Sequence, residues 1–221
     1  LTAGPILLIA NEPDLGTAVT LLPVLGVVVF AAGLPVRYIG IAAIVAVVLA
    51  PAAWVFALQD YQKERIVTFL DPEKDARGAG YQQIQARITV GSGGVTGKGF
   101  MKGTQGQLRF LPVAHNDFIF SVLAEEHGFL GCVLLLGLYF ALVASAVDIS
   151  GSARDRFGNF LAVGITGMLF WQVVINVGMV IGLLPVVGVT LPLMSYGGSS
   201  VIVIFTGIGL LANVGMRRFV N

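Results

Sequence analysis

The sequence of 221 residues carries little charge and almost no cysteine. Charged residues make up 11% of it, whereas about 25% is usual for a soluble globular protein. Its 13 basic and 12 acidic residues nearly cancel, and the formal net charge of +1 argues against a nucleic-acid-binding protein. Cys132 is the only cysteine, which excludes a disulfide-based scaffold and a metal site built from several cysteines.

Apolar residues are what the sequence has in excess. They make up 56% of the chain, and the mean hydropathy is +0.89. A soluble domain of this size cannot bury so much apolar surface, so the composition predicts a polytopic membrane protein. The charges are also spread unevenly, since 14 of the 25 lie within residues 59–119 and none lies within residues 157–216.

Five largely uncharged segments have the length needed to cross a membrane. A bilayer core about 30 Å thick requires about 20 helical residues. Because lipid offers the backbone no hydrogen-bond partner, such segments must be helical. We therefore predict an all-α, polytopic membrane helix bundle with five full spans, a short N-terminal stub and a long extracytoplasmic loop over residues 59–119. The predicted spans are residues 15–36, 38–58, 120–147, 159–184 and 199–216. The stub, Leu1–Ala10, is interpreted as the end of a helix that starts upstream.

The short connections between these spans predict the orientation of the bundle. When the spans alternate, every arginine outside the long loop falls on one side of the membrane. These arginines are Arg37, Arg154, Arg156, Arg217 and Arg218. The short connections on the other side contain no Lys or Arg. By the positive-inside rule the arginine side is cytoplasmic, and the long loop faces outward.

The long loop combines two amphipathic stretches with a glycine-rich segment. Lys63–Leu70 and Tyr81–Val90 have the pattern of short helices lying on the membrane surface. Residues 91–106 contain seven glycines, with Lys98 and Lys102 among them. Glycine lets backbone amides approach an anion and lysine adds positive charge, so this segment predicts a phosphate or pyrophosphate site. A flexible surface loop with solvated lysines is the alternative, and the residue order of a Walker A loop is absent.

Asp117 stands where the long loop meets the next span. A carboxylate at this boundary is placed to act on a lipid headgroup as a general base, a role that a raised pKa favours. The alternative is a cap on the helix that follows, and the amides of a helix N-terminus would lower the pKa of Asp117. The spacing of residues leaves both alternatives open.

Glu125 and Glu126 are charges within a predicted span, an arrangement that is costly and usually functional or paired. Asp117, Ser121 and Glu125 repeat every fourth residue, which would place the three on one helix face. The alternative for the glutamates is an ion pair with a basic residue elsewhere in the bundle. His115 and Asp117 need a third ligand to form a metal site, although a carboxylate can hold Mg²⁺ beside a pyrophosphate. The metal therefore stays unassigned.

Two further polar groups fall on the predicted outer side. Glu12 and Asp14 precede the first span, and Ser195, Ser199 and Ser200 precede the last. Each group either binds a substrate or caps the helix that it precedes. The residues alone thus predict an outward-facing polar pocket above a helix bundle. Such a pocket fits an enzyme acting on a lipid-linked polar substrate, and it also fits a transporter.

Several motifs resemble those of one membrane-protein family over essentially the whole chain. They are EPDLGT at residues 12–17, GTQGQLRFLPVAHNDFIF at residues 103–120, AEEHG at residues 124–128 and LPLMSYGGSS at residues 191–200. In this order they resemble the SEDS proteins (shape, elongation, division and sporulation). The loop looks more like that of the elongation members, RodA, than that of the division members, FtsW. The resemblance implies a ten-helix bundle, of which this chain would lack roughly the first four helices.

The resemblance also implies an activity, the polymerisation of lipid II into peptidoglycan glycan strands during cell-wall elongation. The implied place is the outer face of the bacterial cytoplasmic membrane. Asp117 matches the family's catalytic aspartate and would be the general base on the acceptor hydroxyl. Lys98, Lys102 and Arg109 would offset the charge of the leaving pyrophosphate. Gln105 and His115 would join the outer polar groups named above in binding substrate.

The partners implied by the resemblance are lipid II, the growing glycan strand, membrane lipid and a class B penicillin-binding protein, which is a transpeptidase. Other membrane proteins of the elongation complex are further implied partners. The one candidate cofactor is a divalent cation, Mg²⁺ or Mn²⁺, because such an ion could offset the charge of the leaving pyrophosphate.

Three positions depart from the family pattern. Asn116, Val113 and Glu12 stand where Thr, Glu and Gln are usual, and none of them replaces Asp117. Two other functions would use the same features. A flippase or transporter of lipid-linked precursors needs the bundle and its cavity, and a non-catalytic scaffold of the cell-wall machinery needs only the helix surfaces. Neither requires Asp117 as a base.

Overall fold

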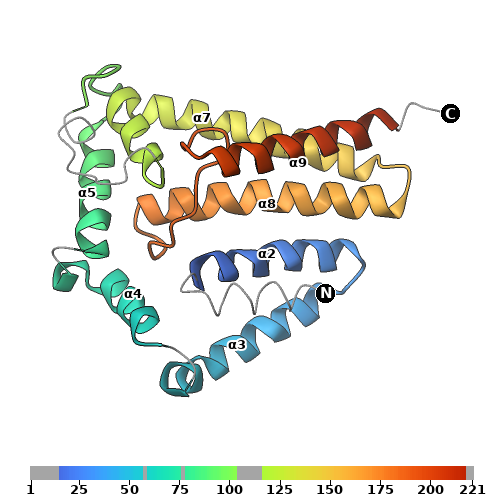
Figure 1. Ribbon diagram of the computed structural model, residues 1–221, viewed down its shortest axis with the longest axis horizontal. Coiled ribbons are helices and arrows are strands. Elements are labelled where there is room, and N and C mark those ends of the chain that lie inside the picture. The colour runs from blue at the N-terminus through green and yellow to red at the C-terminus, as the bar shows by residue number, and fades with distance from the viewer. Residues whose placement is uncertain (1–14, 57–58, 76–77, 104–115, 218–221) are drawn as a thin grey trace.

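A computed structural model of the chain describes residues 15–56, 59–75, 78–103 and 116–217. Every element in these ranges is helical (Figure 1). The elements are α2 (Leu15–Ala31), α3 (Val36–Phe56), α4 (Asp60–Leu70), the short 3₁₀ helix η1 (Pro72–Asp75), α5 (Ala79–Ser92), α7 (Ile119–Gly151), α8 (Arg156–Val180) and α9 (Gly198–Arg217).

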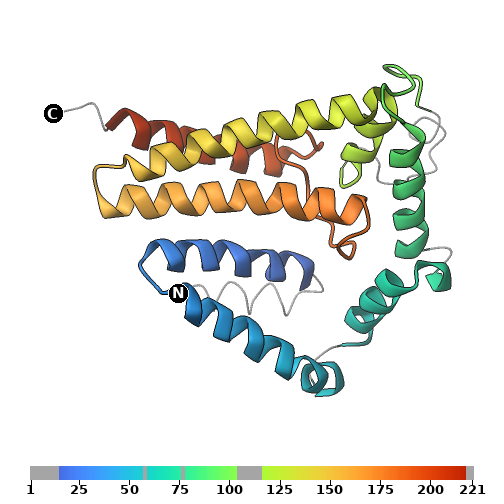
Figure 2. The same ribbon diagram turned by 180° about the vertical axis from the view of Figure 1, so that it is seen from behind.

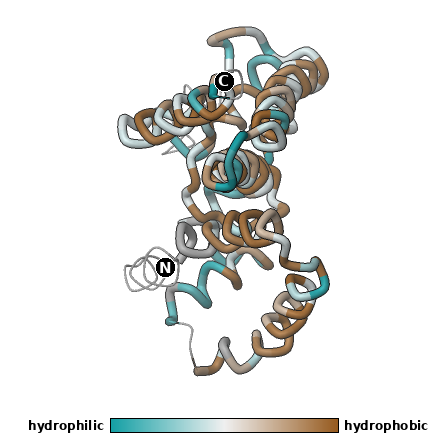
Figure 3. Tube along the Cα trace, turned by 90° about the vertical axis from the view of Figure 1, so that its right-hand side faces the viewer, coloured by the Kyte–Doolittle hydropathy of each residue, from teal (hydrophilic) through white to brown (hydrophobic). Residues whose placement is uncertain are grey.

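Three of the helices, α7, α8 and α9, are long and apolar enough to cross a membrane. α2 and α3 are apolar as well, and each contains one proline, Pro23 and Pro51. The five helices run along one direction, and α3 diverges from the others toward its C-terminal end (Figures 1 and 2). Seen along the bundle, apolar residues cover these helices and hydrophilic residues gather in the connections (Figure 3). The all-α, polytopic membrane bundle predicted from the sequence is confirmed.

α8 is the central helix of the bundle and contacts α2, α7 and α9. Small residues permit the close approach of α2, because a Cβ built at Gly164 or Gly167 would lie 3.5 Å from a valine of that helix. On another side, Ala162 and Leu169 of α8 pack with Ala146 of α7 and with residues of α9 in one apolar cluster. α8 is thereby held between α2, α7 and α9.

α4 and α5 lie across one end of the bundle, at a steep angle to α7 and α8 (Figures 1 and 2). The Asp75 side chain lies at the start of α5 and accepts the amides of Gly78 and Gly80, at 2.8 and 3.3 Å. α5 contacts both α7 and α8. Its Arg87 donates to the carbonyl oxygen of Gly182, just beyond α8, at 2.8 Å. The two surface helices predicted in the long loop are therefore α4 and α5, and α5 closes the end of the bundle where α7 begins.

Candidate active site

Asp117 lies immediately before α7, at the end of the bundle that α5 crosses. The N-cap residue of α7 is Phe118, which is buried and offers no side-chain hydrogen bond to the helix. Asp117 is half-buried. Its carboxylate makes no hydrogen bond or ion pair with any residue in the described part of the chain. The alternative of a helix cap is therefore wrong, and the carboxylate is available to a ligand.

The backbone on either side of the Asp117 side chain is held by two buried polar groups. Asn176 of α8 donates through Nδ2 to the carbonyl oxygen of Asp117 at 2.9 Å and to that of Val189 at 2.6 Å. Ser195 Oγ donates to the carbonyl oxygen of Asn116 at 2.5 Å. Both side chains are almost completely removed from solvent. Asp117 is thus positioned through its main chain, which leaves the carboxylate itself unbonded.

The connection between α8 and α9 folds back beside Asp117. One of its turns is at Gly188, where φ is +71°, a conformation that favours glycine. A Cβ added to Gly188 would lie 3.6 Å from Asp117 Oδ2, so this turn forms a wall next to the carboxylate. Tyr139 of α7 donates its hydroxyl to the carbonyl oxygen of Pro192 and fastens the connection to the bundle.

Burial raises the pKa of Asp117 above its ordinary value. The cause is desolvation, because the charged form loses water and no described donor replaces it. The direction is opposite to that expected for a helix cap. A raised pKa suits a general base, because a stronger base takes a proton from a hydroxyl more readily near neutral pH.

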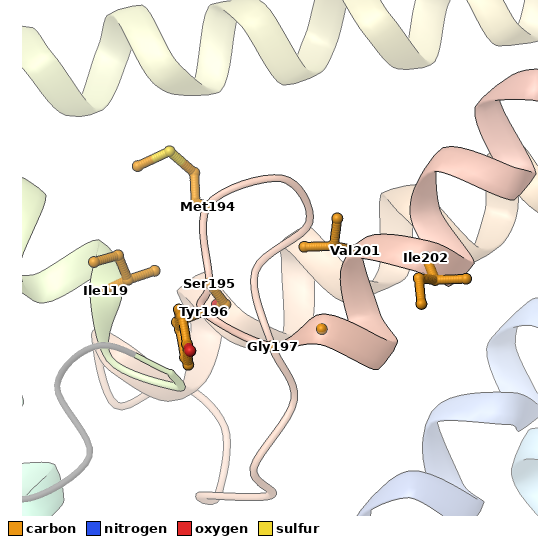
Figure 4. Close-up of a pocket in the computed structure, with 8 residues that line it drawn as sticks. Ile119, Met194, Ser195, Tyr196, Gly197, Val201 and Ile202 are labelled. Atoms are coloured by element: carbon orange, nitrogen blue, oxygen red, sulfur yellow. The ribbon is translucent and has the colours of Figure 1, made fainter.

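An open cavity of about 970 Å³ adjoins the turn that carries Asp117. Ile119 lines it from the start of α7, and the opposite wall runs from Met194 through Tyr196 to Val201 and Ile202 of α9 (Figure 4). Its walls are mainly apolar, apart from the backbone and a few hydroxyls. Asp117 itself is not among the residues that line this cavity, although Ile119, two residues further along the chain, is. Apolar walls of this kind suit an apolar ligand such as a lipid chain.

The three serines predicted to bind substrate are placed differently from one another. Ser195 lines the cavity, yet its hydroxyl already binds Asn116 and accepts the amide of Leu191 at 2.7 Å. Ser200 shares a hydrogen bond with Thr190 at 3.1 Å. Ser199 is exposed in the first turn of α9. Their direct contact with substrate stays a prediction, and the structure adds a positioning task for Ser195.

The glycine-rich segment is docked on the first part of α7. The amides of Lys98 and Gly99 donate to the carbonyl oxygens of Glu125 and Glu126, at 2.9 and 3.0 Å. Lys98 Nζ also contacts Glu125 Oε1 at 2.7 Å, and the Glu125 side chain is 0% exposed. The ion-pair alternative for the glutamates is therefore confirmed for Glu125, and Lys98, although exposed, is paired with Glu125 and not only solvated. Lys98 as a pyrophosphate ligand stays a prediction, in which its ammonium would serve Glu125 and the ligand together.

A kink in α7 makes this docking possible. Gly128 has φ +64° and ψ −162°, which interrupts the helix. The amides of the next two residues donate to the oxygens of Gly94 and Val95, at 2.9 and 3.1 Å, instead of continuing the helix. A Cβ on Gly128 would lie 2.3 Å from the backbone nitrogen of Gly97. Residues 93–99 thus form a clasp around the kink, and the amides of Gly97, Lys98 and Gly99 are already bonded to protein carbonyl oxygens.

The predicted helix face of Asp117, Ser121 and Glu125 needs correction. Ser121 and Glu125 are both buried in α7, but α7 begins at Ile119, so Asp117 precedes the helix. Glu126 is partly exposed, and Lys102 is exposed beside the clasp. The remaining predicted site residues lie outside the described ranges: Glu12, Asp14, Gln105, Arg109 and His115. Among described residues, no group of three His, Cys, Asp or Glu side chains could hold a metal ion.

Asn176 is the functional residue that the sequence interpretation missed. It is 0% exposed and lies in the 60-residue run without charge. A strongly polar side chain within a membrane span is costly and usually has a specific partner, which was the available signal. Its partners, Asp117 and Val189, were not deducible because they lie on other segments.

Residues 1–219 match the profile of the FtsW/RodA/SpoVE family, described as cell cycle protein. The chain belongs to this family. The resemblance inferred from the motifs is confirmed.

Individual relatives agree with the family assignment. The peptidoglycan glycosyltransferase MrdB of Escherichia coli K12 is 48% identical over 215 residues, which are 97% of this chain and 58% of that protein. The chain thus spans little more than half the length of that relative. A solved peptidoglycan synthase complex, described as coordinating polymerization and crosslinking, matches with a TM-score of 0.82 and 37% identity, over 100% of this chain and 61% of the other. The rod shape determining protein RodA of Thermus thermophilus matches with a TM-score of 0.64 and 32% identity, over 100% and 55%.

Proposed function

We propose that the intact protein is a peptidoglycan glycosyltransferase that polymerises lipid II during cell-wall elongation and shape maintenance, with Asp117 as general base. The observation that carries the proposal is the state of the Asp117 carboxylate. It is half-buried, its pKa is raised, and the residue is held only by hydrogen bonds to the backbone oxygens of Asp117 and Asn116. The name of the relative MrdB, a peptidoglycan glycosyltransferase, supports the reaction class.

In the proposed reaction, Asp117 accepts the proton of the 4-hydroxyl of the acceptor sugar. The base is required because an un-ionised sugar hydroxyl is a weak nucleophile. The hydroxyl oxygen bonds to the anomeric carbon of the donor, and the bond from that carbon to the undecaprenyl pyrophosphate oxygen breaks. The carbon inverts, since base and leaving group lie on opposite faces of the sugar.

The leaving pyrophosphate requires positive charge. The proposed sources are Lys98, Arg109 and Lys102, of which Lys102 is exposed beside the clasp. Mg²⁺ or Mn²⁺ remains part of the proposal as a pyrophosphate counterion. The described residues supply Asp117 but no set of three ligands, so we assign the cation no step. Omitting divalent cation from the assay tests whether the cation is obligatory.

The proposed location is the bacterial cytoplasmic membrane, with Asp117 on the outer side. Supporting this orientation, the arginines of the α7–α8 connection and of the end of α9 lie at the end of the bundle opposite to Asp117 (Figure 1). The proposed partner is a class B penicillin-binding protein, a transpeptidase, together with other membrane proteins of the elongation complex. The solved synthase complex that this chain resembles supports a partner of that kind.

Gel-resolved glycan polymerisation from lipid II tests the proposal. The intact protein is purified with its transpeptidase partner, whose own active site is inactivated. Asp117→Asn should lower the polymerisation rate by about 10²–10⁴-fold, the usual contribution of a general base. The matched control is Asp60→Asn, because Asp60 is a fully exposed carboxylate in α4 on the same side of the bundle. It should polymerise like the wild type.

Other outcomes would favour the other functions. Equal products from the wild type and Asp117→Asn would remove Asp117 from the chemistry. Absence of product from every folded sample would contradict a polymerase and favour a transporter or scaffold. Translocation of lipid II across vesicles would then separate those two.

A further inference from the structure

A second cavity lies at the end of the bundle away from Asp117 and plays no part in the proposed reaction. Its volume is about 190 Å³, and it lies between the α7–α8 connection with the start of α8 and the last turns of α9. The helical part of α7 beyond its kink separates it from the Asp117 end by about 35 Å, at 1.5 Å per residue. The α7–α8 connection and the C-terminal end of α9 lie at the same end in both side views (Figures 1 and 2).

Two arginines from separate elements line this cavity. Arg154 belongs to the α7–α8 connection and Arg217 ends α9. A guanidinium group is planar and presents paired donors that match the oxygens of a phosphate. Asp155 also lines the cavity, but its carboxylate accepts the amide of Gly158 at 3.1 Å and so caps α8. The charged side chains that line the cavity, two arginines and one aspartate, therefore carry a formal net charge of +1.

The charge of the whole membrane face agrees with an anionic ligand. The described residues at this end carry four arginines (Arg37, Arg154, Arg156 and Arg217) and two aspartates (Asp148 and Asp155). The formal balance is therefore +2. Anionic headgroups are attracted to such a face, and a cavity within it concentrates that attraction at one place.

Apart from Asn213, the other side chains that line the cavity are apolar. Phe157 and Leu161 of α8 and Leu210 and Val214 of α9 line it below the arginines. Phe157 is 75% exposed although it begins a spanning helix, which fits an aromatic side chain at the membrane boundary. A free phosphate ion gains no binding energy from apolar side chains. A phospholipid carries both a phosphate and acyl chains, and it can therefore contact the arginines and the apolar side chains together.

We infer that this cavity binds the headgroup phosphate of an anionic phospholipid, such as phosphatidylglycerol, between Arg154 and Arg217. The glycerol and the first acyl carbons lie along Phe157, Leu161 and Leu210. The bound lipid joins the α7–α8 connection to the end of α9. This inference does not depend on the proposed glycosyltransferase activity.

Native mass spectrometry of the intact protein in detergent tests the inference. The protein is titrated with phosphatidylglycerol, with phosphatidylcholine or with inorganic phosphate. Each arginine that contacts the phosphate should contribute about fivefold to retention, so Arg154→Gln with Arg217→Gln should weaken phosphatidylglycerol binding by about 25-fold. The matched control is Arg156→Gln, because Arg156 is exposed at the same face but does not line the cavity. It should change retention by less than about twofold.

A second variant tests the cavity without removing either arginine. Asn213→Trp places a bulky ring into the cavity that Asn213 lines. It should lose the bound phosphatidylglycerol while its thermal unfolding stays that of the wild type. This variant keeps the test decisive if the double arginine variant does not fold.

Four results would overturn the inference. Arg156→Gln weakening retention as much as the double variant of Arg154 and Arg217 would show only a general surface attraction. Equal retention of phosphatidylcholine would exclude recognition of the anionic headgroup. Displacement of the lipid by millimolar inorganic phosphate would show a site for the free ion. Unchanged retention by Asn213→Trp would place the lipid elsewhere.

Discussion

Replacing Asn176 should separate the positioning of Asp117 from the stability of the bundle. Asn176 Nδ2 is the donor to two carbonyl oxygens, those of Asp117 and Val189. Asn176→Leu keeps a similar volume but leaves both buried oxygens without this donor. Each unsatisfied group costs about 1–3 kcal/mol, and because the two share one donor we expect about 2–4 kcal/mol of lost stability.

The effect on polymerisation should exceed the effect of that instability. Asp117 would lose one of the two bonds that position its backbone, and a displacement of about 1 Å in a catalytic group costs about 100-fold in rate. The measurement pairs thermal unfolding in detergent with the initial rate of glycan polymerisation, at a temperature where the variant is still folded.

A second asparagine in the same helix provides the control. Asn159 Nδ2 donates to the carbonyl oxygen of Ser150 at 2.7 Å, at the end of α8 away from Asp117. Asn159→Leu should cost about 1–2 kcal/mol of stability, and the polymerisation rate should stay near that of the wild type. Equal losses of rate in Asn176→Leu and Asn159→Leu, or a wild-type rate in Asn176→Leu, would refute the positioning role.

Three further variants test other parts of the structure by thermal unfolding. Burial raises the pKa of Asp117 in the folded state, so the folded protein becomes less stable as the pH rises through that pKa and the buried carboxylate ionises. Asp117→Asn removes this charge and should therefore raise the Tm at pH 7 and not at pH 4. Glu125→Gln should cost about 2–3 kcal/mol, at the low end for a broken buried pair because the Lys98 side chain is 32% exposed; Glu126→Gln, the control, should cost less. Gly128→Ala should prevent stable folding, whereas Gly137→Ala, with nothing within 4 Å of the new Cβ, should be tolerated. Unchanged unfolding of Gly128→Ala would contradict the clasp.

The helices were predictable because their physical signals are local. Long runs without charge predicted α8 and α9, since lipid forces such runs into helices. The amphipathic stretches of the long loop predicted α4 and α5. The start of α7 was predicted to within one residue, since the predicted span begins at residue 120 and the helix begins at Ile119.

The candidate site was predictable in part. A carboxylate at the boundary of a span marked Asp117, and the cost of a charge within a span indicated a partner for Glu125. The partner itself, Lys98, lies 27 residues away, and the kink at Gly128 brings the two segments together. The bond from Asn176 to Asp117 crosses 59 residues. Pairings of this kind depend on how the helices pack, which no local pattern specifies.

We propose the unbonded, half-buried carboxylate of Asp117 as the general base of a glycan polymerase. The most direct test is the rate of glycan polymerisation from lipid II as a function of pH. Because the base must be deprotonated and burial raises its pKa, the wild-type rate should rise with pH through a midpoint above the ordinary aspartate value of 3.8. In Asp117→Asn this acidic limb should disappear together with most of the rate. An acidic limb that persists unchanged in Asp117→Asn would assign the base to another group and contradict the account.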